Sequence, residues 1–250
     1  MNKSVLRVLV LTKRNLKELI RDPLSLVFMI LLPLTMEILF YYLFHNATSQ
    51  FEMKYLAPGI VVFSQSFSTL FTGLLIALDR STAFLTRLYV TKTKSFEFIF
   101  GYLFSILPTA ILQAILFYIV GGVIDPSLFG VGMLLAIVFS VITGFFFIGF
   151  GIFLGSVCNE KSIGGISSIV IAGQSVLSGM WFPTEGLPDG FIVFMKCLPF
   201  KNATDLISIS TSGISGNEQS FLVSLAIVCA YAVAVILLGI IFFKRQMTSK

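Results

Sequence analysis

Charged side chains are scarce in this chain. Asp, Glu, Lys and Arg make up 12% of its 250 residues, against roughly 25% in a typical soluble domain. Hydrophobic residues make up 56%. The segments between the apolar stretches are each too short to build a core of their own. These absences exclude an ordinary water-soluble domain and an attached cytosolic enzyme domain.

Catalytic and nucleotide-binding motifs are also missing. The sequence contains no G-x-x-x-x-G-K-[ST] phosphate loop, no H-E-x-x-H and no G-x-S-x-G, and its one histidine is His45. The three cysteines, Cys158, Cys197 and Cys229, lie on different segments without metal-site spacing. We therefore expect no catalytic residue, no metal site and no cofactor bound by this chain, and we do not expect an enzyme.

Long uncharged stretches dominate what is present. Only helices and closed barrels satisfy their backbone in lipid, and these stretches lack the alternation of barrel strands. About 20 helical residues cross the roughly 30 Å of bilayer hydrocarbon. The sequence thus predicts an all-α membrane protein, one domain over residues 1–250, with six transmembrane helices at 24–44, 55–78, 98–120, 128–157, 163–182 and 221–243.

Basic residues predict the orientation, because cytoplasmic loops of membrane proteins are enriched in Lys and Arg. Placing both termini in the cytoplasm puts 14 of the 17 basic residues inside and leaves Lys54, Lys196 and Lys201 outside. The net charge of +5 then indicates membrane topology and attraction to anionic lipid. Nucleic acid is not an expected partner, since the charges are divided among several loops.

The segment 1–23 has a pattern of its own. Its basic residues recur at helical spacing, while several leucines lie away from them, which is typical of a helix in the membrane interface. Asp22-Pro23 then ends the helix, because the residue before proline avoids the α region. The alternative is a basic tail that serves only topology.

Polar residues inside the predicted spans are few. Glu37 is the one ionisable Asp, Glu, Lys, Arg or His side chain within them, and we favour a structural or cavity-lining role over proton coupling, since no other span offers a charged partner. Gln65, Gln113 and Gln174 are neutral and suit hydrogen bonds between helices. Gly151 and the glycine four residues later predict a close helix–helix approach.

Several short motifs resemble those of one transporter family, the type-2 ABC exporter permeases. The entry helix of that family is similar to LTKRNL at 11–16 followed by RDP at 21–23. The start of its second span is similar to YLAPGI at 55–60. Its fifth span and outer re-entrant segment are similar to LSGMWFP at 177–183, LP at 187–188 and LPF at 198–200. One departure is Thr91-Lys92, where the family often has Thr-Pro.

The resemblance implies a permease subunit of an ATP-driven exporter in a cell membrane, with the bacterial plasma membrane expected. Its partners would be a cytoplasmic ABC ATPase, which holds ATP and Mg, and a second permease copy or homologue. The implied substrate is amphiphilic: a drug, peptide, lipid or lipid-linked glycan. Two alternatives stay open: a self-sufficient secondary transporter or channel, and a non-transporting immunity or sensor protein.

Two sets of site residues follow. The resemblance implies that the second and fifth spans line a cavity between two permeases, so we expect the substrate pathway to include Gln65, Phe67, Phe71, Gln174, Ser178 and Glu37. Helix packing by the same amides is the alternative.

The loop 79–97 is the longest one expected in the cytoplasm between spans, and we expect it to couple to the ATPase. The contact residues would be Arg87, Leu88, Tyr89 and Val90. The alternative is a basic loop that only fixes topology. On the opposite side, residues 183–220 are expected to form an outer re-entrant segment.

Overall fold

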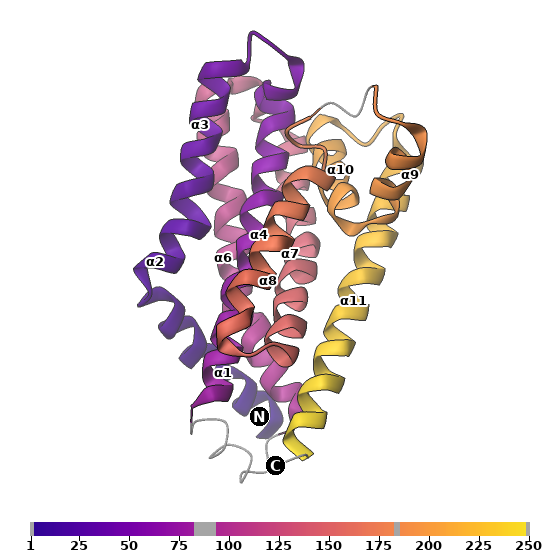
Figure 1. Ribbon diagram of the computed structural model, residues 1–250. Coiled ribbons are helices and arrows are strands. Elements are labelled where there is room, and N and C mark those ends of the chain that lie inside the picture. Colours follow the sequence, from indigo (N-terminus) through magenta and orange to yellow (C-terminus); the bar gives the residue numbers. More distant parts are fainter. Residues whose placement is uncertain (1–2, 83–93, 183–185, 249–250) are drawn as a thin grey trace.

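The computed structural model describes residues 3–82, 94–182 and 186–248, with side chains to residue 245. Within these residues every regular element is a helix (Figure 1). The longest helices are α4 (Met53–Ser81), α6 (Ser95–Ile124), α7 (Val131–Val157) and α11 (Glu218–Thr248). The shorter ones are α1 (Lys3–Ile20), α2 (Pro23–Leu26), η1 (Val27–Leu31), α3 (Leu32–Phe44), η2 (Ser49–Phe51), η3 (Pro126–Leu128), α8 (Glu160–Leu177), α9 (Asp189–Cys197) and α10 (Pro199–Ser212).

Among the described residues, five helices are long and apolar enough to cross a membrane. They are the continuous helix 23–44, formed by α2, η1 and α3, together with α4, α6, α7 and α11 up to residue 245. They stand side by side as a bundle (Figure 1). The prediction of an all-α membrane protein is confirmed.

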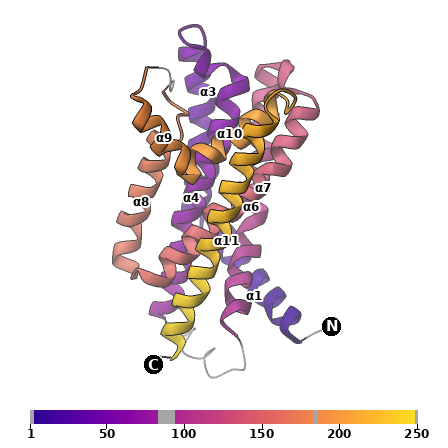
Figure 2. The same cartoon turned by 90° about the vertical axis from the view of Figure 1, so that its right-hand side faces the viewer.

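The predicted span 163–182 corresponds to α8, which has 18 residues and ends at Leu177. Gly179, at a φ of +71°, turns the chain just after it, a conformation that favours glycine. α8 runs along the bundle from the end that holds both termini toward the other end (Figures 1 and 2). The five long helices and α8 therefore make six passages along the bundle, and the membrane topology stays a prediction.

The bend between α1 and α2 has a local cause. Pro23 opens α2, where its missing N–H is no loss and its fixed φ suits the helix. The Asp22 carboxylate accepts hydrogen bonds from the backbone N–H groups of Leu24 (3.2 Å) and Ser25 (3.3 Å), so it caps the new helix. The predicted break at Asp22-Pro23 is confirmed.

Helix α4 lies at the centre of the bundle. It packs against α3, α6, α7, α8 and α10, and most of its residues are buried. Its buried polar side chains need partners, because an unpaired polar group in an apolar interior is costly. Most find one on a neighbouring helix or on α4 itself: Thr69 donates to the carbonyl of Phe147 at 2.9 Å, and Ser64 to the carbonyl of Val61 at 2.7 Å.

Glycines bring α4 and α7 close together, as the spacing of Gly151 and Gly155 predicts. A methyl group placed on Gly151 would lie 2.5 Å from the carbonyl oxygen of Thr69. One placed on Gly155 would lie 2.7 Å from the carbonyl oxygen of Gly73. The backbones thus touch where these residues carry no side chain.

The segment 183–220 is compact in its described part. α10 packs against α7, α11 and α4, and α9 lies beside it at the end of the bundle away from the termini (Figure 1). The Asn202 amide ties the two helices by donating to the carbonyls of Lys196 and Leu198, both at 2.7 Å. The Thr211 hydroxyl lies 2.5 Å from that of Tyr118 on α6. The sequence predicted an outer re-entrant segment over residues 183–220, but it did not predict the helices α9 and α10.

The α4–α7 contact makes a testable prediction. Gly151→Ala forces the two backbones apart, and overpacking of this kind costs about 1–3 kcal/mol. We expect a lower thermal unfolding temperature of the detergent-solubilised protein. The matched control is Gly164→Ala on α8, where the added methyl meets nothing within 4 Å. An unfolding temperature of Gly151→Ala equal to that of the control would contradict the packing.

Candidate functional site

An apolar groove of about 490 Å³ separates α2 and η1 from α4 and α8. Two of the predicted pathway residues, Phe67 and Phe71, lie on its α4 wall, and each is 8% exposed. The ring of Phe67 lies 6.4 Å from that of Phe28 and 5.3 Å from that of Phe63. The other lining residues are Leu24, Leu70, Ser168, Ile171, Ala172 and Ser175. The groove offers hydrocarbon and ring surface with two hydroxyls.

Near Phe63, aromatic contacts link the segment after α8 to α3 and α4. The Trp181 ring lies 5.9 Å from Phe63 and 4.7 Å from Phe40. The Gln50 amide donates to the carbonyls of Gly179 (2.9 Å) and Met180 (3.1 Å), which ties the α3–α4 connection to this turn. Phe63, Trp181 and Gln50 were not predicted as site residues, although Trp181 stands in the motif LSGMWFP.

Gln174 and Ser178 lie beside this turn and are not among the residues that line the groove. Both are fully buried. The Gln174 amide nitrogen faces the sulfur of Met180 at 3.9 Å, and the Ser178 hydroxyl oxygen accepts from the backbone N–H of Met180 at 3.3 Å. Their neighbour Ser175 lines the groove, and its hydroxyl donates to the carbonyl of Ile171 at 2.9 Å. The two side chains support the fold of the turn.

Gln65 lies in the contact between α4 and α7. Its amide nitrogen donates to the carbonyl of Ser140 at 2.9 Å, and its amide oxygen accepts from the Thr143 hydroxyl at 2.6 Å. The whole side chain is buried. This geometry corresponds to the packing alternative that the sequence left open. Gln113 is also buried between helices and donates to the carbonyls of Met29 (2.9 Å) and Ser64 (3.3 Å).

Glu37 is buried on α3 and faces α6. A methyl group placed on Gly121 would lie 3.2 Å from a Glu37 carboxyl oxygen, and Met53 and Leu128 line the same spot. Neither carboxyl oxygen has a hydrogen-bond partner among the described residues. Glu37 is not among the residues that line the apolar groove.

Helix α1 is anchored to the bundle by ion pairs. Arg14 binds the carboxylate of Asp79, which also accepts from the Tyr102 hydroxyl at 2.6 Å. Burial lowers the pKa of Arg14, but the hydrogen bond and the charge of Asp79 raise it more, so the net shift is upward. Glu97 accepts from Ser4 at 2.5 Å.

A second pair and an apolar contact add to this anchor. Arg7 lies 3.3 Å from Glu97, and Leu11 packs onto Gly101, where an added methyl would meet its Cβ at 2.7 Å. Sequence reasoning missed Asp79, Glu97 and Tyr102. A signal was present in the sequence, because Asp79 and Glu97 flank the two ends of one predicted loop, and the segment 1–23 is basic.

The predicted coupling residues Arg87, Leu88, Tyr89 and Val90 lie outside the described residues. The end of α4 and the start of α6, between which that connection runs, lie at the end of the bundle that holds the termini and α1 (Figure 2).

Comparison with known proteins decides the family. Residues 7–211, most of the chain, match the family described as ABC-2 type transporter. The chain belongs to the ABC-2 type transporter family. In an alignment of 148 positions that covers 56% of its length, this permease is 37% identical to a protein of Cyanophora paradoxa named "Putative transport permease ycf38". The match spans 48% of that relative's length. The resemblance drawn from the motifs is confirmed at the level of the family.

The anchor of α1 is testable in this permease. Asp79→Asn removes the charge that Arg14 and Tyr102 face, and hydrogen bonds to charged groups contribute about 1.5–3 kcal/mol each. We expect a correspondingly lower free energy of unfolding by thermal denaturation. Asp189→Asn, an exposed acid on α9, is the control. A loss for Asp79→Asn no larger than that of the control would contradict the anchor.

Proposed function

We propose that this ABC-2 permease is the membrane-spanning subunit of an ATP-driven exporter that moves an amphiphilic substrate out of the cytoplasm or inner leaflet. The observation that carries the proposal is an apolar groove between the central helix α4 and α8, with two hydroxyls from α8, in a chain that belongs to this family. Such a surface suits the hydrocarbon part of a drug, peptide, lipid or lipid-linked glycan better than a bare ion.

The proposed complex has two permeases and separate ABC ATPases. The groove is open along one side, and a second permease copy or homologue facing it would convert it into a central cavity. ATP and Mg would bind to the ATPases, because this sequence lacks the phosphate loop. Closure of the ATPases would push on the connection 79–97 and on α1, which is tied to α4 and α6 by Asp79 and Glu97.

The proposed topology has six spans and places both termini in the cytoplasm. The proposed location is a cell membrane, such as the plasma membrane of a bacterium. Helix α8 would be the short fifth span. The described basic residues support this orientation: most lie on α1, at the ends of α4 and α11 and at the starts of α6 and α8, and these ends lie together (Figure 1).

Labelling tests the topology. In a cysteine-free background, Ser215→Cys lies between α10 and α11 at the outer end, whereas Ser162→Cys lies at the start of α8. We expect an impermeant thiol reagent to modify Ser215→Cys in intact cells and to spare Ser162→Cys until the membrane is opened. The reverse pattern would contradict the orientation.

Charge reversal tests the coupling. Arg87→Glu is expected to reduce co-purification with the ABC ATPase, or ATP-driven transport, at least five-fold without changing membrane insertion, because a basic contact becomes repulsive. Lys54→Glu reverses a charge at the opposite end of the bundle and serves as the control. Parental association and transport in Arg87→Glu would rule out the coupling contact.

Truncation of the groove tests the pathway. Phe71→Ala and Phe67→Ala remove ring surface from the groove wall, so we expect a several-fold change in transport rate or substrate range, with basal ATP hydrolysis of the complex retained. Phe104→Ala removes an exposed ring of α6 and is the control. If both groove variants transport an identified substrate at the parental rate and affinity, the pathway lies elsewhere.

A further inference from the structure

Glu37 is a buried acid whose carboxyl group has no partner. It lies on α3, which runs toward the end of the bundle away from the termini (Figure 1). The residue is 0% exposed, and neither carboxyl oxygen has a hydrogen-bond partner among the described residues. None of the ion pairs in that part of the chain includes it. An isolated carboxylate in an apolar interior is so costly that such a group takes up a proton instead.

The surroundings of the carboxyl group favour a proton over any larger occupant. The side chains of Met53 and Leu128 border it, and a methyl group placed on Gly121 would lie 3.2 Å from one of its oxygens. A bound water would need several polar partners, which these neighbours do not offer. A metal ion would need several ligands, and the described residues hold no cluster of three or more His, Cys, Asp or Glu side chains. A proton needs only the carboxyl oxygen itself.

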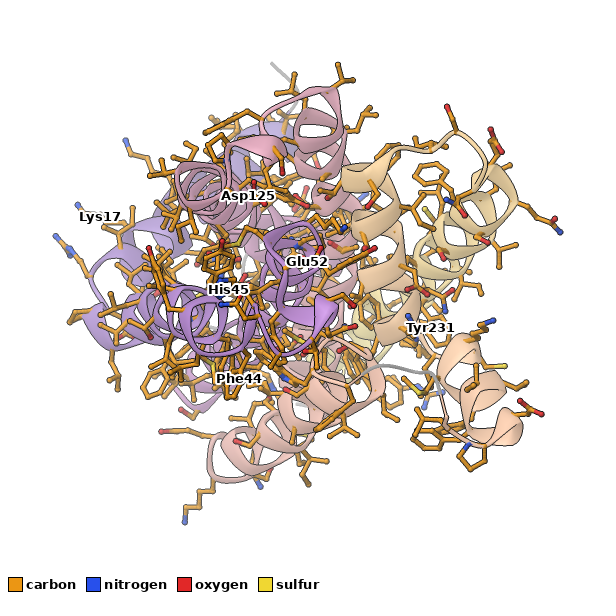
Figure 3. All side chains as sticks on the ribbon, turned by 90° about the horizontal axis from the view of Figure 1, so that it is seen from above. Lys17, Phe44, His45, Glu52, Asp125 and Tyr231 are labelled. Atoms are coloured by element: carbon orange, nitrogen blue, oxygen red, sulfur yellow. The ribbon has the colours of Figure 1, made fainter. Side chains whose placement is uncertain are left out.

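The ionisable groups at the same end of the bundle are engaged elsewhere (Figure 3). The ring nitrogen Nδ1 of His45 lies 2.7 Å from the carbonyl of Tyr41, and Asp125 caps η3. Glu52 pairs with Lys54 at 2.8 Å. Within the described residues, none of these groups supplies a hydrogen bond or a compensating charge to the carboxyl group of α3.

The elements packed against α3 add no positive charge either. They are η1, η2, α4 and α6, and the first two carry no titratable side chain. Tyr118 of α6 interacts electrostatically with Glu37, but it is fully buried, and its hydroxyl lies 2.5 Å from that of Thr211. Asp79 and Glu97 lie at the opposite ends of α4 and α6. A neutral phenol is therefore what the acid faces on α6.

The helix that carries Glu37 has a pivot below it. η1 is a π-helical turn, and Pro33 follows near the start of α3. Both interrupt the regular hydrogen bonding of an α-helix, and helices bend at such places. Gln113 fastens η1 by donating to the carbonyl of Met29 at 2.9 Å. Among the described residues, no side-chain hydrogen bond or ion pair joins α3 to another helix, so apolar contact holds α3 in place.

We propose that Glu37 is a proton-binding site that latches α3 onto α6. While the O–H bond is intact, the neutral acid stays buried between the two helices. When that bond breaks, the proton passes to water and a carboxylate remains. The bare carboxylate then drives α3 away from α6, about the pivot at η1 and Pro33, until water reaches it. The site does not depend on the export function.

Infrared spectroscopy tests the proton. The full-length chain in non-ionic detergent at pH 7 is compared with Glu37→Gln. We expect the difference spectrum to contain the carbonyl band of a protonated carboxylic acid. Glu218→Gln removes an exposed acid at the start of α11 and is the control, for which we expect no such band. A difference spectrum of Glu37→Gln without the band would overturn the proposal.

Neutral substitutions test the missing partner. Glu37→Gln and Glu37→Met replace a neutral acid by neutral side chains of similar size, so we expect both to retain the parental thermal unfolding temperature. Asp79→Asn removes an acid that has a charged partner, and we expect it to lower that temperature. Losses for both Glu37 variants as large as that of Asp79→Asn would mean that Glu37 is a paired carboxylate and would refute the site.

The one tryptophan of the chain reports the latch. The ring of Trp181 lies 4.7 Å from that of Phe40 on α3, so a departure of α3 exposes more of the indole to water. From pH 7 to pH 9, below the range in which tyrosines ionise, we expect the emission of the parental chain to shift to the red. Glu37→Gln has no proton to lose and is expected to keep its emission. Emission that stays constant in both chains, or shifts equally in both, would overturn the latch.

Discussion

The structure depends on one constraint: polar groups in the middle of an apolar bundle must find their partners inside the protein. Among the described helices, α4 carries the largest share of these groups, and it lies among five other helices. Gln65 and Thr69 bond to α7, and Gln113 reaches from α6 to the carbonyl of Ser64 on α4. Each bond fixes the rotation of a helix, so the polar side chains decide which face of α4 is left for the groove.

The rotation of each helix about its axis decides which side chains face the groove. This is why the lining of the groove was harder to predict than the positions of the helices. The hydrophobic stretches predicted the helices to within a few residues, for example 128–157 against Val131–Val157 for α7. A helix that is apolar all round gives no sign of which side meets lipid, protein or substrate. The sequence therefore placed Gln65 and Phe67 in one pathway, although they point to different neighbours, α7 and the groove.

The sequence analysis also missed the ion pairs between residues far apart in the chain and the short helix α10. α10 has 14 residues and mixes polar with apolar positions, so it lacks the signal of a spanning helix. The bond of Arg14 to Asp79 joins residues 65 positions apart, and periodicity within a segment says nothing of such pairs. Gly151 was predicted correctly, because the spacing of small residues on one helix is a local property.

The groove and the anchor of α1 share helix α4. Phe67 and Phe71 of α4 line the groove, and Asp79 at the end of the same helix binds Arg14 of α1. A movement of α1 would therefore be transmitted along α4 to the wall of the groove through a partly buried ion pair. In the proposed mechanism this link lets an ATPase at the membrane surface change the shape of the pathway.

Reconstitution tests the central claim most directly. The permease and its co-purified ATPase are placed in vesicles that contain a fluorescent phospholipid, and its movement between leaflets is followed with an impermeant quencher. The account predicts movement that requires ATP hydrolysis and the ATPase, and that stops on vanadate addition. Equal movement by the permease alone, or movement driven by an ion gradient without ATP, would contradict it.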